Sequence, residues 1–353
     1  MPPGPRGRGA GFNPANRHAA WEREEVDDGW PPDGEPAPPL VTQLTPDASR
    51  SIISWNRSPD VPFDRSVNPY RGCEHGCIYC YARPSHAWLG LSPGLEFESR
   101  LFFKPDAPAL LRRELSKPGY RAAPLALSGD TDAYQPSERR LGLTRGLLEV
   151  LVEFRHPVLI VTKSALIERD LDLLQALAEA DLVRVSLSLT TLDPALARQL
   201  EPRASAPARR LAALAKLSQA GVPVGVMAAP VIPALTDQDL EALLGQAKDA
   251  GAAWASYVLL RLPLEVEALF RDWLARYYPQ RAERVLSLLR DSHAGQLYDP
   301  RFGARMAGDG PVAQLIAQRF RLAQRRLGFG VWSAPDSGQF RVPRSGPEQL
   351  SLW

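Results

Sequence analysis

The chain has 353 residues, enough for one large domain of barrel size or for two ordinary domains. Its 44% hydrophobic content supports a sizeable core, and a net charge of +2, from 42 basic and 40 acidic residues, excludes a protein whose whole surface binds a polyanion. The sequence contains no apolar run long enough to cross a membrane, and its first residues lack the apolar core of a secretory signal. We therefore expect a cytoplasmic protein with no membrane partner.

Residues 1–50 are rich in Pro, Gly and Arg and show no hydrophobic periodicity. The run PPDGEPAPP at 31–39 is incompatible with a regular helix or strand. This composition predicts a mostly disordered tail. Its first arginines, Arg6 and Arg8, are too few to indicate a nucleic-acid-binding arm.

All the cysteines of the chain, Cys73, Cys77 and Cys80, lie within eight residues in the spacing C-x3-C-x2-C. An odd number of cysteines cannot all be paired in disulfides, and secreted proteins rarely place every cysteine in one short segment. Thiolates favour iron–sulfur clusters, zinc or copper(I). If the three cysteines hold a four-iron cluster, one iron has no protein ligand and is open for chemistry.

Two other interpretations of the cysteine spacing remain open. A structural zinc ion could take its fourth ligand from His75 or His86, although zinc ligands usually come as two separated pairs. The chain would then be a zinc-stapled binding protein rather than an enzyme. A redox pair of Cys77 and Cys80 would leave Cys73 without a role.

From residue 51 to about 261, short apolar runs alternate with amphipathic stretches of helical length, which predicts an α/β fold. With one more strand just before Cys73, there are about six βα units, which can form either a barrel or a doubly wound sheet. From 262 to about 330 the pattern becomes helical, which predicts a C-terminal helical extension followed by an irregular tail to residue 353. The apolar runs typical of buried parallel strands are residues 124–128, 157–162, 182–189, 222–229 and 254–260.

The segment NPYRGCEHGCIYCYAR (68–83), with Tyr79 directly before the last cysteine, resembles the radical S-adenosylmethionine (SAM) superfamily. The motifs SGDTDAYQPSE, VTKS, SLSLTTLD and LEPRA follow in order, so that residues 60–262 resemble the spore-photoproduct-lyase-like branch, often labelled DNA repair photolyase. The resemblance implies a partial (β/α)6 TIM-like barrel and a [4Fe–4S] cluster on the three cysteines. It also implies reductive cleavage of SAM to a 5′-deoxyadenosyl radical that takes hydrogen from a substrate, with electrons from ferredoxin or flavodoxin.

The same resemblance implies contacts to SAM from residues at the carboxyl ends of the strands. Each has a plainer alternative: Thr131 can cap a helix, Lys163 can extend to solvent, and a small residue can simply be tolerated inside a barrel. For Glu201 we expect a structural ion pair with a nearby arginine. The implied contacts are Tyr79 and Ala229 to the adenine, Thr131 to the amino group, Lys163 to the methionyl carboxylate, and Ser188 to the ribose or methionyl group.

One feature departs from spore photoproduct lyases, which carry a fourth cysteine that returns hydrogen to the product. The corresponding stretch here is Leu127-Ser128-Gly129-Asp130, and Tyr134 is the nearest side chain able to lose a hydrogen atom. The substrate therefore stays open between a nucleic acid and a peptide or small molecule. A basic patch for nucleic acid could form from Arg100, Lys104, Arg112, Arg113, Lys117 and Arg121, although charge runs on helices are usually solvated faces.

Overall fold

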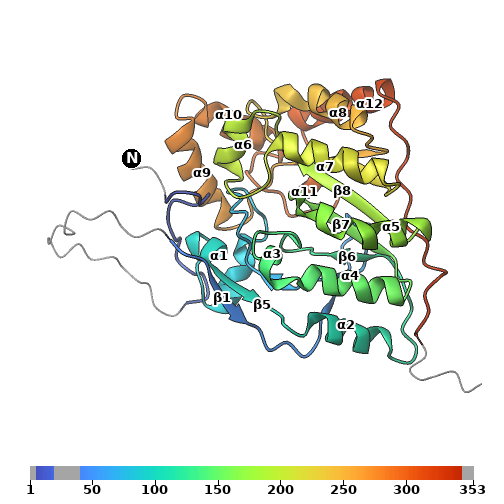
Figure 1. The fold of residues 1–353 in the computed structure, drawn as a ribbon. Coiled ribbons are helices and arrows are strands. Elements are labelled where there is room, and N and C mark those ends of the chain that lie inside the picture. The colour runs from blue at the N-terminus through green and yellow to red at the C-terminus, as the bar shows by residue number, and fades with distance from the viewer. Residues whose placement is uncertain (1–4, 20–39, 344–353) are drawn as a thin grey trace, which may run out of the picture.

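The computed structural model describes residues 5–19 and 40–343. At its centre lies a seven-stranded sheet in the order β10-β9-β8-β7-β6-β3-β2, in which β2 (Ile53–Trp55) is an antiparallel edge strand (Figure 1). The other six strands run parallel, which confirms the predicted partial (β/α)6 barrel. These are β3 (Arg65–Val67), β6 (Leu125–Leu127), β7 (Val158–Thr162), β8 (Val183–Leu189), β9 (Val224–Val231) and β10 (Ala255–Leu259).

Helices cover the outer face of this sheet and link its parallel strands in a row that Figure 1 shows from α2 to α8. They form because leucines recur at three- and four-residue spacing, so that Leu147, Leu148 and Leu151 of α4 all reach the main core. The linking helices are α2 (Ala107–Leu115), α3 (Glu138–Leu141), α4 (Leu143–Glu153), α5 (Leu171–Glu179), α6 (Pro194–Leu200), α7 (Pro207–Gln219) and α8 (Leu240–Asp249), with short 3-10 turns at Ala165–Asp170 and Asp237–Asp239.

A second, three-stranded sheet in the order β1-β5-β4 carries the cysteine segment. Strand β4 (Tyr70–Arg71) leads directly into Cys73, and a 3-10 helix (Arg83–Leu89) follows Cys80. The chain then forms α1 (Leu95–Ser99) and β5 (Arg100–Phe103), which pairs antiparallel with β4 and parallel with β1 (Gln43–Pro46). The cysteine segment is therefore held at both ends by one small sheet.

The prediction of a disordered tail over residues 1–50 is wrong for the two parts that the structure describes. The backbone N–H groups of Gly9 and Ala10 each donate to the Glu98 carboxylate at 2.9 Å, and β1 adds to the edge of β5. A composition poor in apolar residues does not prevent such packing, because backbone hydrogen bonds carry it. Residues 1–4 and 20–39 of the predicted tail lie outside the described residues.

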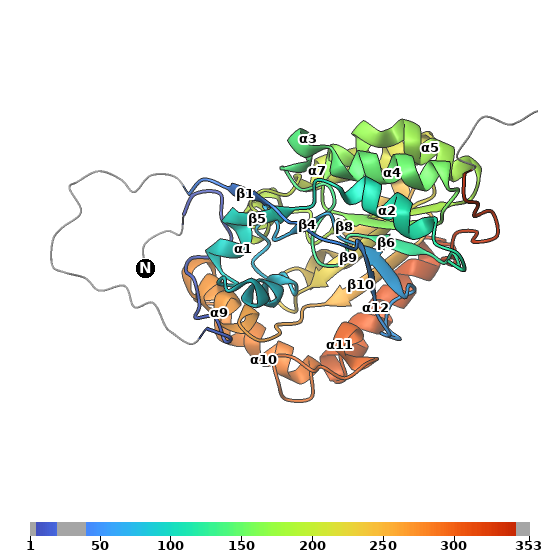
Figure 2. The ribbon, with the colours of Figure 1, turned by 90° about the horizontal axis from the view of Figure 1, so that it is seen from below.

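After β10 the described chain forms helices and irregular segments. Phe270 and Trp273 of α9 belong to the same apolar cluster as Ile78 and Tyr79 of the cysteine segment, so α9 and α10 lie beside that segment in Figure 2. No helix in the described part of the chain is long and apolar enough to cross a membrane. Residues 344–353 of the predicted tail are outside the description. The helices are α9 (Val266–Tyr277), α10 (Ala282–Ser292), α11 (Ala304–Ala307) and α12 (Pro311–Arg326).

A buried histidine, His156, lies just before the amino end of β7. Its Nδ1 lies 2.9 Å from the carbonyl oxygen of Pro157, which can only accept, so Nδ1 carries the proton. Its Nε2 then accepts from the Tyr120 hydroxyl at 2.9 Å. Burial lowers the pKa of His156 to about 4, so folding requires the neutral ring.

We predict that stability falls as the pH drops from about 6.5, the pKa of an unfolded histidine, towards about 4. In this range the unfolded chain binds more protons than the folded chain, so the free energy of unfolding decreases by up to about 1 kcal/mol per pH unit from this residue. Urea unfolding of the wild type and of His156→Gln at about pH 7 and about pH 5 measures the effect. Equal pH dependence in the two proteins would contradict the prediction.

Candidate functional site

The three cysteines lie on one tight segment between β4 and the first 3-10 helix. The backbone N–H of Gly76 donates to the carbonyl of Cys73 at 3.3 Å, and the N–H of Cys80 donates to that of Cys77 at 3.2 Å. Gly76 has φ +65°, a left-handed conformation in which a side chain is strained, and a Cβ there would meet Glu98 Oε2 at 2.7 Å. None of the three cysteines is in a disulfide, and Cys80 is the most exposed of them.

Burial controls the protonation of these thiols. It raises the pKa of Cys73, Cys77 and Cys80, with further contributions from carboxylates at Asp132 beside Cys73 and Glu201 beside Cys77. Neutral thiols are therefore favoured until a cation binds them, and metal binding would release the protons. Three soft sulfur donors in one loop fit an iron–sulfur cluster.

A fully buried ion pair, Arg83 with Glu98, packs against the cysteine segment. The Arg83 guanidinium also donates to the carbonyl of Cys77 at 2.9 Å and to that of Gly76 at 3.2 Å. Two more of its hydrogen bonds reach the carbonyls of Pro93 and Gly94. One side chain thus fixes the backbone of the cysteine loop to the turn before α1.

The other half of the pair binds the N-terminal segment. Glu98 accepts the two N–H groups of Gly9 and Ala10, and a Cβ at Gly9 would lie 1.9 Å from the carbonyl oxygen of Gly76. Only glycine permits this approach of the two backbones. The cysteine loop is therefore packed between the Arg83–Glu98 pair and residues 8–10.

Lys163 lies at the centre of the strand ends, as the sequence predicts, and brings Ser188 and Ala229 together. Its Nζ donates to Ser188 Oγ at 2.9 Å and to the carbonyl oxygen of Ala229 at 2.9 Å. The same atom lies 3.0 Å from Glu201 Oε1 and 5.5 Å from the centre of the Tyr79 ring. The chain itself thus supplies an anion for this partly buried lysine, and the contact of Lys163 with the methionyl carboxylate stays a prediction.

Glu201 also forms the expected arginine pair, with Arg210, and accepts from the hydroxyls of Tyr79 and Thr190. Burial alone would raise the pKa of Glu201, but Arg210 and Lys163 hold it well below its ordinary value. The carboxylate is therefore ionised at neutral pH. It fixes the Tyr79 ring beside Cys77 and next to the strand ends.

Thr131 and the neighbouring Ser128 follow β6, and their hydroxyls have no hydrogen-bond partner within the described chain. Ser128 has φ +69°, an unusual conformation for a residue with a side chain. Next to Thr131, Asp132 accepts the Lys163 N–H at 2.8 Å and the Thr162 hydroxyl at 2.7 Å. Thr131 thus lies beside Asp132 after the end of β6, with a buried hydroxyl that has no partner among the described residues.

The histidines considered for zinc have other partners. His75 Nδ1 is 3.4 Å from Asp132 Oδ2, and His86 Nε2 is 2.9 Å from the carbonyl of Arg100. Among the described residues, no three His, Cys, Asp or Glu side chains are grouped so as to hold a single metal ion. Burial would raise the pKa of Asp132, but His75 and the hydrogen bonds from Lys163 N–H and Thr162 hold it below its ordinary value.

The structure places two further groups of side chains that the sequence analysis considered. Tyr134 is fully buried in the main core. In the suggested basic patch, Arg100 pairs with Glu96, Arg112 pairs with Glu153, and Lys104 is buried on the carbonyl of Asn68. Two of the six cations are therefore paired with carboxylates, and the binding of nucleic acid by this patch stays a prediction.

Two residues at the mouth of the barrel escaped the sequence analysis. Tyr81 is 47% exposed and donates to the carbonyl of Gly129, and Arg261 lies over its ring, with Cζ 4.2 Å from the ring centre. Their positions in the sequence offered a signal, since Tyr81 directly follows Cys80 and Arg261 follows β10.

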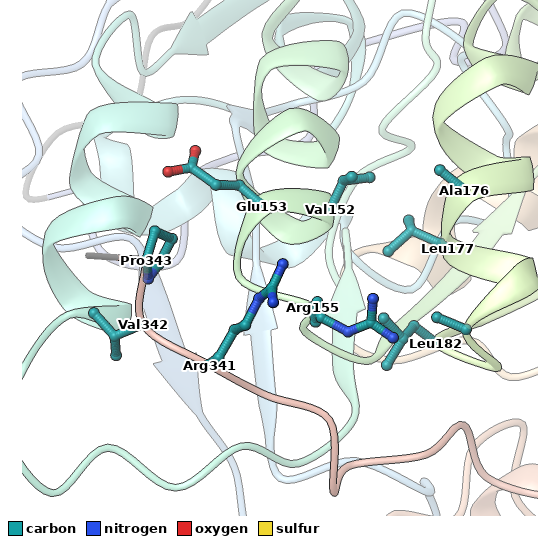
Figure 3. A pocket seen from close by; sticks show the side chains of 10 residues that line it. Val152, Glu153, Arg155, Ala176, Leu177, Leu182, Arg341, Val342 and Pro343 are labelled. Atoms are coloured by element: carbon teal, nitrogen blue, oxygen red, sulfur yellow. The ribbon is translucent and has the colours of Figure 1, made fainter. Parts of the chain in front are cut away.

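A surface hollow of about 790 Å³, shown in Figure 3, is lined by none of the three cysteines. Arg155 precedes β7 and Leu182 precedes β8, so the hollow is at the amino ends of the strands, whereas the cysteine-facing residues follow the carboxyl ends. It contains none of the predicted site residues. Its lining is Val152, Glu153, Arg155, Ala176, Leu177, Ala180, Leu182, Arg341, Val342 and Pro343.

Comparison with known proteins places this geometry in context. Residues 67–247 match the family model of the radical SAM superfamily. An uncharacterised protein of Mycobacterium tuberculosis is 38% identical over 265 residues, 74% of this chain and 76% of the relative. Another, of Methanocaldococcus jannaschii, is 29% identical over 219 residues, 62% of this chain and 78% of the relative.

Two solved structures share the fold at low sequence identity. A mutant of spore photoproduct lyase has a TM-score of 0.55 and 16% identity, with 80% of this chain and 78% of that chain covered. Spore photoproduct lyase complexed with dinucleoside spore photoproduct has a TM-score of 0.52 at the same identity and coverage. At this identity the likeness concerns the fold.

We predict that Glu98→Gln destabilises the protein by about 3–5 kcal/mol, because it leaves the buried Arg83 charge without its counter-ion. Urea unfolding measures the change. A matched control, Glu153→Gln, breaks the half-exposed pair with Arg112 and should cost less than about 1 kcal/mol. Similar losses in the two variants would show that the Arg83–Glu98 pair does not support the loop.

Proposed function

The chain belongs to the radical SAM superfamily, and we propose that it binds a [4Fe–4S] cluster through Cys73, Cys77 and Cys80 and uses it to cleave S-adenosylmethionine. Membership of this family implies SAM, an iron–sulfur cluster and an electron donor. The observation that carries the proposal is the position of three disulfide-free thiols beside the polar group of Lys163, Ser188 and Ala229 at the strand ends.

When bound, the cluster and SAM supply a 5′-deoxyadenosyl radical that abstracts hydrogen from a substrate. The chain's own residues orient and enclose these groups. We assign the adenine to the surface around Tyr79 and Ala229, and the amino group to the free hydroxyl of Thr131. Ser188, whose hydroxyl already donates to the Ala229 carbonyl at 3.2 Å, keeps an acceptor for the ribose or methionyl group.

For the substrate we propose a nucleic acid, with a peptide or small molecule as the alternative. Support comes from the structural neighbour, which is complexed with a dinucleoside spore photoproduct. This chain has no cysteine at positions 127–130 that could return a hydrogen atom to a product radical. Tyr134, the other side chain considered for this role, is buried in the core, and we do not assign the role to it. Reversal of a thymine photoproduct by a thiol at that position is therefore not part of the proposal.

For the electron donor we propose a reduced ferredoxin or flavodoxin. The three thiols are free, and a reducing cytoplasm keeps thiols in that state. This supports the cytoplasm as the place of the reaction.

Reconstitution with iron and sulfide without oxygen tests the function. We expect a reduced [4Fe–4S] signal in electron paramagnetic resonance that changes when SAM is added, because SAM would bind the iron without a cysteine ligand. Cys73→Ala, Cys77→Ala and Cys80→Ala should each lose the cluster and keep the fold by circular dichroism. A colourless protein that binds zinc, or a cluster that does not respond to SAM, would refute the proposal.

A second prediction concerns Lys163, whose ammonium already has Glu201 as its partner. We expect Lys163→Met to reduce SAM affinity about tenfold, because the ammonium that we assign to the methionyl carboxylate is lost. It should also lower the free energy of unfolding, because the Glu201 charge loses one of its two cations. Urea unfolding and equilibrium binding of SAM to the reconstituted protein measure the two effects. Normal SAM affinity in a folded Lys163→Met variant would contradict the assignment of the ammonium to the methionyl carboxylate.

A further inference from the structure

Arg261 is a partly buried cation at the mouth of the barrel. It lies two residues after the end of β10, and its guanidinium lies over Tyr81, with Cζ 4.2 Å from the ring centre. Tyr81 is the residue after Cys80, and its hydroxyl donates to the carbonyl of Gly129, next to Ser128. Arg261 therefore lies on the same side of the barrel as the cysteines and the free hydroxyls.

Within residues 5–19 and 40–343, Arg261 has no hydrogen-bond acceptor and no carboxylate in ion-pair distance. Burial lowers the pKa of Arg261, Tyr81 and Tyr298 raise it, and the nearby Arg305 lowers it. A guanidinium has five N–H donors, and those of Arg261 have no partner among the described residues, so they can donate to a ligand.

The neighbouring arginine shows the contrast. Arg305 donates to the Asp60 carboxylate and to the Ser58 hydroxyl, and the backbone N–H of Gly303 donates to Asp60 at 2.7 Å. These contacts tie the edge of the barrel near β2 to the segment before α11. Arg305 is thus engaged in holding two parts of the chain together, whereas Arg261 is not.

We propose that Arg261 is an anion-binding residue of the active site, which holds an oxyanion at the mouth of the barrel through its guanidinium. The ligand is either the carboxylate of SAM or a phosphate of a nucleic-acid substrate, since both match the planar fork of an arginine. The inference rests on the proposed function, because it places the anion beside the cysteine segment. It is consistent with the position of Lys163, whose charge is already balanced by Glu201.

The plainer alternative is that Arg261 only stacks on Tyr81. A cation–π contact uses the face of the guanidinium and leaves its N–H groups at the rim, where they are free to donate to a ligand. Stacking therefore orients Arg261 without satisfying it. The two roles are separable, because only anion binding changes the affinity for a ligand.

The test compares Arg261→Gln with the wild type and with Arg321→Gln, which removes an exposed arginine of α12. The reconstituted proteins are titrated with SAM, followed by electron paramagnetic resonance, and with a short single-stranded DNA oligonucleotide over a series of salt concentrations. Arg261→Lys keeps the charge and should restore part of any lost affinity. Thermal unfolding checks that each variant is folded.

We expect Arg261→Gln to lose about tenfold in affinity for one of the two ligands, while Arg321→Gln loses none. Loss for SAM alone identifies the cofactor carboxylate. Loss for the oligonucleotide, with a salt slope reduced by about 0.7, identifies a phosphate. Unchanged affinity for both ligands overturns the inference and leaves Arg261 as a stacking residue.

Failure of the proposed function gives a different result. If the wild-type cluster does not respond to SAM, the enzyme proposal fails, but the oligonucleotide titration needs no cluster chemistry and still decides the role of Arg261. If the wild type binds neither ligand, both proposals are overturned. If the wild type binds both and Arg261→Gln does so equally, only the present inference fails.

Discussion

The buried pair of Arg83 and Glu98 is the interaction on which the cysteine segment depends. Neither side chain reaches solvent, and each uses its remaining hydrogen bonds on backbone from a different part of the chain. Arg83 holds the carbonyls of the cysteine loop, while Glu98 holds the N–H groups of residues 9 and 10. Ile78 and Tyr79 of this loop pack in an apolar cluster, and the hydrogen bonds of the ion pair fix the backbone of the loop to its neighbouring segments.

A second buried charge group plays the same part on the barrel side. Glu201 has two cations, Lys163 and Arg210, and it accepts from the Tyr79 hydroxyl. It therefore joins the cysteine segment to the ends of β7 and β8 and to α7. A buried ion pair contributes little net stability. Its charges nevertheless need their specific partners, and this requirement favours one arrangement of the strands and helices that carry them. The two groups together fix the cysteines against the strand ends.

The sequence was sufficient for the parts of the protein that depend on local pattern. Buried strands such as 182–189 carry continuous apolar runs, and three clustered cysteines indicate that they bind a metal or an iron–sulfur cluster. It was insufficient where a residue's role depends on a distant partner. Gly9 lies in a segment with a disordered composition, and only its approach to Gly76 reveals its packing. Lys163 was placed correctly at a strand end, but the anion beside it, Glu201, follows β8 and could not be assigned from spacing.

The cations near the site differ in whether the chain itself supplies a carboxylate partner, and this difference bears on the choice of substrate. Three cations near the cysteine segment and the strand ends, Arg83, Lys163 and Arg210, have carboxylates of the chain as partners, so their charges are balanced within the described structure. Arg261 has no such partner among the described residues, and it lies where the chain leaves β10 for the C-terminal helices. Those helices also pack on the cysteine segment. The anion site proposed at Arg261 therefore lies between the buried ion pairs and the C-terminal extension, so changes in that extension would alter the mouth of the barrel without breaking those pairs.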